Sequence, residues 1–200
     1  MKDWVKIFKE IKSWVILFVL ALFFSALINS QLFAMATVKE VSMQDTLFED
    51  QILFINRLAY KNKSPKAGDI IIFYKSREIG SFTEEFLRSV SYILPFTRPK
   101  DDNKDRLVKR VIGTSGDIID IKDGYVYKNG ERLEEPYAKG DTNATYIEFP
   151  VTVGENQLFV LGDNREHSRD SREFGLIDIS HVEGKASFRL YPFNKIGKLQ

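Results

Sequence analysis

The most restrictive feature of the sequence is an N-terminal stretch, residues 13–38, that contains no acidic or basic side chain. Within it, residues 14–28 are apolar apart from Ser25. A helix needs about 20 mostly apolar residues to cross the hydrocarbon core of a bilayer, and this run reaches that length when residues 29–31 are included. We therefore expect a single transmembrane anchor at residues 13–36.

The charges before the anchor predict its orientation. Residues 1–12 carry four lysines and two acidic side chains, and basic flanks favour the cytoplasmic side. We therefore expect residues 1–12 in the cytoplasm and residues 37–200 outside the cell membrane. A removable signal peptide is the alternative, because Ala34-Met35-Ala36 has the small-residue pattern of a cleavage site. The length of the apolar run favours the retained anchor, and both alternatives export the rest of the chain.

The exported part has the pattern of a mostly β, antiparallel fold. Asn129-Gly130 supplies the positive φ values of a tight hairpin, so residues 125–127 should pair with residues 132–133. Short apolar or alternating runs bounded by turn residues predict strands at 51–55, 69–73, 107–112, 118–121, 125–127, 148–153, 158–161 and 186–191.

One segment, residues 76–105, is predicted to be a variable insertion into this β domain. Residues 81–94 place apolar side chains at helical spacing and end before Pro95. We favour a short helix that covers a sheet edge, since half-buried amphipathic helices are common. The alternative is that residues 92–96 enter the membrane interface, where aromatic side chains are frequent.

Composition excludes several classes of function. The chain has 29 basic and 28 acidic residues, so its net charge of +1 gives no electrostatic bias toward nucleic acid. It has no cysteine, which excludes disulfides and thiolate metal sites. A nucleophile would have to be Ser, Thr or a carboxylate. His167 and Asp170 are available for a Ser-His-Asp triad, but His167 lies within a highly charged segment, residues 163–173, where an exposed imidazole is unremarkable.

A lysine on an apolar strand is the other available base. To accept a proton it must be neutral, and burial among apolar groups lowers the pKa of a lysine from about 10.4. Alternation along the strand at 107–112 places Lys109 on the face of Leu107 and Val111, with Arg110 on the opposite face. Arg110 stays charged and should pair with a carboxylate. In the competing interpretation, Lys109 lies on an edge strand and extends to solvent.

Four blocks of sequence resemble, in their order, the type I signal peptidases of bacteria, and the resemblance extends from the anchor to about Tyr191. These blocks are Val41-Ser42-Met43-Gln44-Asp45-Thr46-Leu47, Lys66-Ala67-Gly68-Asp69, Val108-Lys109-Arg110-Val111-Ile112-Gly113, and Gly162-Asp163-Asn164-Arg165 with Ser168, Asp170, Ser171 and Arg172.

The resemblance implies a signal-peptidase fold and a role for each matching residue. Ser42 corresponds to the nucleophile, Lys109 to the general base, and Ser168 to a hydroxyl that hydrogen-bonds the lysine amine and orients it. The supporting residues correspond to two ion pairs, which are Asp163 with Arg110 and Asp170 with Arg172. The charged segment would then hold Ser168 against Lys109. The alternative interpretation is that this segment is a solvated, charged turn.

The implied reaction is acyl transfer on exported preproteins that have small residues before the cleavage site. The Ser42 backbone N–H would contribute to the oxyanion hole, and an extended substrate would pair with strand edges beside the site. The expected partners are these preproteins and the lipid bilayer. The resemblance calls for no cofactor, metal or nucleic acid.

The sequence departs from the family pattern beside the nucleophile. Asp45 replaces a proline that stiffens the turn, and Glu40 stands where glycine or serine is frequent. If residues 38–42 are extended, the Glu40 carboxylate shares the face of Ser42 and favours the ammonium form of Lys109. These changes suggest a weak or narrowly tuned peptidase. The alternative function is a signal-peptidase-like accessory or chaperone protein that assists the assembly of pilin subunits.

Overall fold

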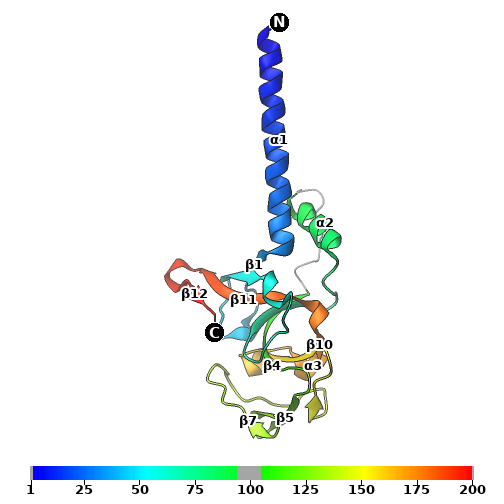
Figure 1. The fold of residues 1–200 in the computed structure, drawn as a ribbon. Helices are drawn as coiled ribbons and strands as arrows, with labels where there is room; N and C mark the ends of the chain where they lie inside the picture. The colour runs from blue at the N-terminus through cyan, green and yellow to red at the C-terminus, as the bar shows by residue number, and fades with distance from the viewer. Residues whose placement is uncertain (1, 94–104, 200) are drawn as a thin grey trace. The chain divides into compact units, whose positions relative to one another are not determined.

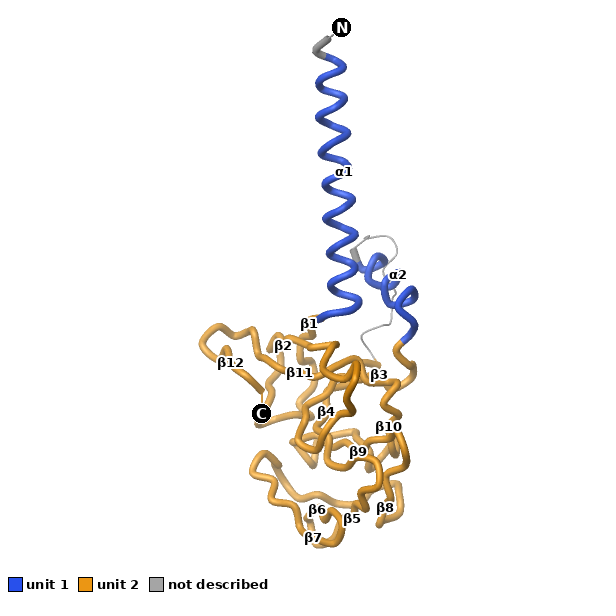
Figure 2. Tube along the Cα trace, viewed as in Figure 1, with its two compact units in different colours: residues 1–33, 80–101 blue, residues 34–79, 102–200 orange. Residues whose placement is uncertain are grey.

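The computed structural model describes residues 2–93 and 105–199, which fall into two compact units (Figure 2). One unit comprises residues 1–33 and 80–101, and the other comprises residues 34–79 and 102–200. The first unit is helical and the second is built from β-sheets (Figure 1).

The first unit contains two helices, α1 (Lys2–Gln31) and α2 (Phe82–Ile93). By length and composition, α1 holds one candidate membrane span, Trp4–Gln31. The helix begins before the predicted anchor. Residues 2–12 contain no glycine or proline, so nothing in them interrupts the helix. It also ends earlier than the predicted anchor, since residues 33–37 form a strand.

Helix α2 agrees with the predicted helix at 81–94. Its start is a capping box, in which the Ser81 backbone N–H donates to the Glu84 carboxylate and the Glu84 N–H donates to the Ser81 hydroxyl. The rings of Phe23 and Phe86 lie 5.4 Å apart and join the two helices of the unit. Residues 94–104 lie outside the described part of the chain. The predicted insertion at 76–105 and the membrane contact of residues 92–96 therefore stay predictions.

The second unit contains two sheets, and the strand pairs from β2 to β12 whose registers are defined are antiparallel. The larger has the order β1-β2-β11-β3-β4-β9-β10, with β12 paired to β11, and the smaller has the order β7-β6-β5-β8. The strands are β1 (Phe33–Thr37), β2 (Ile52–Asn56), β3 (Ile70–Tyr74), β4 (Arg106–Gly113), β5 (Ile118–Lys122), β6 (Tyr125–Lys128), β7 (Glu131–Arg132), β8 (Val151–Thr152), β9 (Gln157–Leu161), β10 (Ile177–Asp178), β11 (Val182–Tyr191) and β12 (Gly197–Lys198).

Short helices connect several of these strands. Five are 3-10 helices and one is an α-helix, in the described part of the chain: η1 (Val41–Met43), η2 (Arg57–Tyr60), η3 (Arg165–His167), α3 (Ser171–Phe174), η4 (Ile179–His181) and η5 (Phe193–Lys195).

The predicted mostly β, antiparallel fold is confirmed, and most predicted strands are present. The predicted hairpin is also confirmed, because Tyr127 pairs with Arg132 across Asn129 and Gly130, which have φ values of 55° and 86°. The strand predicted at 148–153 is shorter, since only β8 forms; Pro150 lacks the N–H that a ladder requires. The strands β1, β10 and β12 were not predicted, because short strands leave little periodic signal.

The position of β4 decides how the site is built. This strand lies between β3 and β9 in the larger sheet, and its second half is buried. A central strand offers a lysine no lateral route to solvent. The edge-strand interpretation of Lys109 is therefore wrong, and its side chain is 0% exposed.

Candidate active site

A serine and a lysine from distant parts of the chain meet in the interior of the β unit. The Lys109 amine donates a hydrogen bond to the Ser42 hydroxyl, with 2.7 Å between Nζ and Oγ. Ser42 is 5% exposed and Lys109 is fully buried. A hydroxyl in direct contact with a buried amine is the arrangement that an activated serine nucleophile requires.

Ser42 is held in place through the backbone around it. It lies in η1, whose Met43 packs in the same core cluster as Val38 and Leu47. The Asn164 backbone N–H donates to the Ser42 carbonyl, and the Asn164 side-chain amide donates to the Val41 carbonyl, both at 3.1 Å. The segment after β9 therefore fixes the position of η1.

The surroundings of Lys109 lower the pKa of its amine. Burial lowers the pKa of the Lys109 amine from its ordinary value, while the carboxylates of Glu40, Asp170 and Asp163 oppose this shift. The Arg172 guanidinium adds to the lowering by repelling the ammonium charge. Loss of hydration is the dominant effect, as expected for a lysine enclosed by apolar strands.

The structure brings Arg110 and Asp163 together on the other face of β4. Two hydrogen bonds of 2.9 and 2.8 Å join the guanidinium to both carboxylate oxygens. The Arg110 side chain also lies 3.9 Å from the centre of the Tyr137 ring, and Thr46 donates to Asp163. Because Thr46 follows Ser42 closely in the chain, this ion pair also restrains the loop after Ser42.

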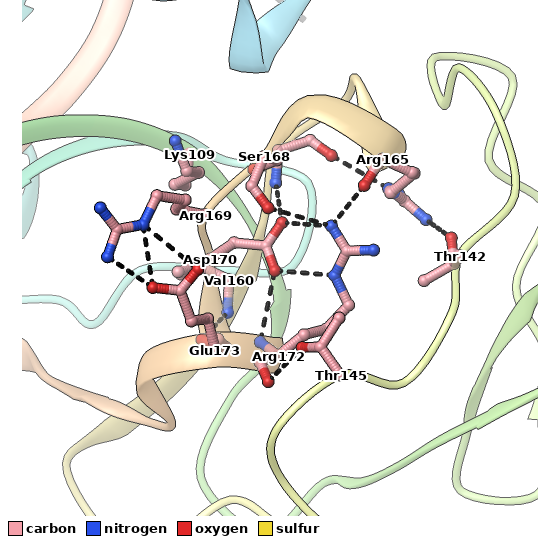
Figure 3. A network of polar contacts seen from close by, with 12 residues as sticks. Lys109, Thr142, Thr145, Val160, Arg165, Ser168, Arg169, Asp170, Arg172 and Glu173 are labelled. Atoms are coloured by element: carbon pink, nitrogen blue, oxygen red, sulfur yellow. Dashed lines mark hydrogen bonds and ion pairs between the residues drawn. The ribbon is translucent and has the colours of Figure 1, made fainter.

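The structure also brings Asp170 and Arg172 together, and Figure 3 shows their contact. Arg172 donates to both Asp170 oxygens at 2.8 Å, and Asp170 accepts the Gly162 backbone N–H at 3.1 Å. Arg172 also donates to the Arg165 carbonyl at 2.7 Å. The charged segment is therefore internally bonded around a buried core of Asp163, Arg165, Asp170 and Arg172, and the alternative of a solvated turn is wrong, although Glu166, His167 and Arg169 are exposed.

Ser168 lies close to the serine–lysine pair, but the expected hydrogen bond between Ser168 and Lys109 is not formed. The Lys109 amine donates to Ser42 instead, and within residues 2–93 and 105–199 the buried Ser168 Oγ has no hydrogen-bond partner. A Cβ added at Gly162 would lie 2.1 Å from the Ser168 Oγ and 2.4 Å from the Ser42 carbonyl oxygen. The Ser168 hydroxyl and the Ser42 carbonyl therefore occupy the space that a side chain at residue 162 would fill.

A Ser-His-Asp triad is not assembled. Asp170 is engaged by Arg172, whereas His167 is exposed and its Nδ1 lies 3.4 Å from the Asn164 side-chain oxygen. The described residues also hold no group of three or more His, Asp or Glu side chains placed to bind a metal ion.

Sequence reasoning missed a third buried ion pair beneath the site. Arg165 donates to both Glu135 oxygens at 2.9 and 2.7 Å and to the Thr142 hydroxyl at 2.6 Å. Arg165 is 2% exposed, and Glu135 precedes it by 30 residues in a loop without periodic pattern. No local signal in the sequence indicated this partner.

Comparison with known proteins identifies the family of the chain. The family model described as "Signal peptidase, peptidase S26" matches residues 11–191. The chain belongs to this family. It is 30% identical to signal peptidase IB of Staphylococcus aureus strain COL over 203 residues, covering 94% of this chain and 93% of the relative. It is 32% identical to signal peptidase I of Bacillus licheniformis over 194 residues, covering 92% and 91%.

One solved structure is similar to this chain in sequence. The crystal structure of a signal peptidase I from Enterococcus faecalis is 30% identical, with a TM-score of 0.39, and the match covers 62% of this chain and 97% of that one. The family model and the two relatives confirm the predicted resemblance to type I signal peptidases at the level of the family.

Proposed function

We propose that this chain is a membrane-bound serine endopeptidase that removes N-terminal signal peptides from exported preproteins, with Ser42 as nucleophile and Lys109 as general base. The observation that carries this proposal is the 2.7 Å contact between the Lys109 amine and the Ser42 hydroxyl. Membership of the signal peptidase family supports the substrate class.

The proposed reaction proceeds in two steps. The Ser42 Oγ attacks the scissile carbonyl carbon while Lys109 Nζ takes the hydroxyl proton. The ammonium then protonates the leaving amine, and an ester between the signal peptide and Ser42 remains. Lys109 next takes a proton from water as the water oxygen attacks the ester carbonyl carbon, and the ammonium returns that proton to the Ser42 oxygen as the ester C–O bond breaks and the signal peptide leaves as a carboxylate. The Ser42 backbone N–H would stabilise the oxyanion in both steps.

The base can act only when Lys109 is unprotonated, which gives the reaction a characteristic pH dependence. The rate is expected to rise with pH through the pKa of Lys109 in the folded protein. Burial lowers that pKa below the ordinary lysine value, so the rise falls at lower pH than for an exposed lysine.

The substrate would bind as an extended peptide with small side chains one and three residues before the cleaved bond. Neither the family match nor the named relatives favour a role in pilin assembly, so the accessory alternative is not proposed.

The proposal is tested by cleavage of a precursor with an Ala-x-Ala site by full-length protein in detergent micelles. We expect Ser42→Ala and Lys109→Met each to reduce kcat/KM by about a thousandfold or more, because either change removes a reacting group. Ser64→Ala and Lys61→Met change exposed residues outside the site and should leave kcat/KM unaltered. Cleavage by Ser42→Ala at the wild-type rate would refute the proposal.

A further inference from the structure

A third side chain, Glu40, reaches the serine–lysine pair from the segment before η1. Its backbone is extended, with φ −116° and ψ 152°, two residues before Ser42. One carboxylate oxygen lies 4.0 Å from the Lys109 amine, while the Glu40 side chain remains 61% exposed. Glu40 therefore faces the buried amine from the solvent side of the site.

The other charges that face Lys109 are balanced by partners. The Asp163 carboxylate, after β9, is paired with Arg110, and the Asp170 carboxylate, at the start of α3, is paired with Arg172. Each pair has a contact of 2.8 Å, so much of the field of each carboxylate at Lys109 is offset by its arginine.

Glu40 lacks such a partner. In the described part of the chain, the ion pair that Glu40 forms is the 4.0 Å contact with Lys109. The exposed Arg169 also interacts electrostatically with Glu40, but its hydrogen bonds, at 2.8 and 2.6 Å, go to the Glu173 carboxylate. Among the residues that the structure describes, Glu40 is therefore the carboxylate facing Lys109 that has no 2.8 Å ion pair with an arginine of the kind that engages Asp163 and Asp170.

We propose that Glu40 is a positioning residue that sets the pH threshold of the peptidase by stabilising the ammonium form of Lys109. This inference rests on the proposed function, because it concerns the base of that reaction. The carboxylate acts through Lys109 and takes no part in bond making or breaking.

The sign of the effect follows from the charges. A carboxylate stabilises an ammonium ion, so Glu40 raises the pKa of Lys109 and opposes the effect of burial. Removing its charge should lower the pKa of the amine. Because Glu40 is largely exposed, water screens the interaction, and at 4 Å a shift of roughly one pH unit is expected.

A direct measurement is the titration of the Lys109 amine in full-length protein, labelled with ¹³C at the lysine ε-carbon and held in detergent micelles. The Lys109 resonance is assigned by its loss in Lys109→Met. In Glu40→Gln, which removes the charge and keeps the size, we expect the midpoint to fall by about one pH unit. Glu155→Gln removes an exposed carboxylate elsewhere and should leave the midpoint unchanged.

Precursor cleavage gives a second measurement on the same proteins. The acid limb of kcat/KM in Glu40→Gln should move to lower pH by about the same amount. At pH values below the wild-type midpoint, cleavage should be up to about tenfold faster than in wild type. The rate at high pH should match wild type, where Lys109 is neutral in both. Glu40→Asp keeps the charge on a shorter side chain and should titrate between the two.

The outcomes separate this inference from the proposed function. An unchanged or higher Lys109 midpoint in Glu40→Gln would overturn the role of Glu40, as would loss of cleavage at every pH in that variant. Cleavage that survives Ser42→Ala would overturn the serine mechanism, whereas the amine titration would still report on Glu40.

Discussion

At the scale of single residues, Gly162 shows how closely the groups of the site are packed. A Cβ at this position would lie 2.4 Å from the Ser42 carbonyl oxygen and 2.1 Å from the Ser168 hydroxyl. The hydroxyl could rotate away, but the Ser42 carbonyl is backbone and is also held by the Asn164 N–H. Any side chain at position 162 would push η1 away and separate Ser42 from Lys109, so this position requires glycine.

We therefore expect Gly162→Ala to displace Ser42 and to reduce kcat/KM by about a hundredfold, the effect of a misplacement near 1 Å. The measurement is precursor cleavage, with the melting temperature followed in parallel to show that the protein folds. Gly197→Ala is the matched control, because its added Cβ meets nothing within 4 Å and its φ is not in the left-handed region. Wild-type activity in Gly162→Ala would show that η1 keeps its place despite the added Cβ.

At the scale of elements, the short strand β1 makes the Ala34-Met35-Ala36 segment a poor cleavage site. These residues resemble a cleavage site in the sequence, yet they form part of a strand paired with β2. Ala34 and Ala36 pack against the core cluster that contains Val38. A peptidase requires its substrate as a free extended segment, and these residues are already bound in a sheet.

We accordingly expect the folded chain to remain uncut after Ala36. Intact-mass spectrometry of the wild type and of Ser42→Ala, after prolonged incubation in micelles, should give the full-length mass for both. A fragment that begins at Thr37 in the wild type alone would show self-cleavage and would contradict the protection by β1.

Strand β4 shows which parts of the site were predictable from the sequence. Alternation along β4 correctly separated Lys109 from Arg110, because side chains of a strand point to opposite faces. The strand's place between β3 and β9 could not be read from its own residues. That placement is what buries Lys109, and it depends on segments far away in the chain.

At the scale of the whole molecule, the apolar helix α1 and the β unit predict a protein that stays with the membrane. Its candidate span, Trp4–Gln31, exceeds the length needed to cross hydrocarbon. The lysines of residues 1–12 predict a cytoplasmic N-terminus and an exported β unit.

We expect the protein to remain in the membrane pellet after extraction at alkaline pH. Protease added to the outside of spheroplasts should digest the β unit and spare an N-terminal tag. The double variant Val19→Arg/Leu20→Arg places two charges within the span, at about 2.5 to 3.5 kcal/mol each, and should weaken membrane retention. Digestion of the tag from outside would reverse the predicted orientation.

Local patterns in the sequence were sufficient for the apolar helix, most of the strands, the hairpin at Asn129-Gly130 and the family motifs, because each depends on neighbouring residues. Tertiary structure decided the rest. It placed Ser42 against Lys109 across 67 residues and paired Arg165 with Glu135 across 30, and it left the Ser168 hydroxyl above Gly162. Such contacts require the sheet to bring distant segments together. Burial of Lys109, which lowers its pKa, is likewise a property of the packed sheet and not of the strand alone.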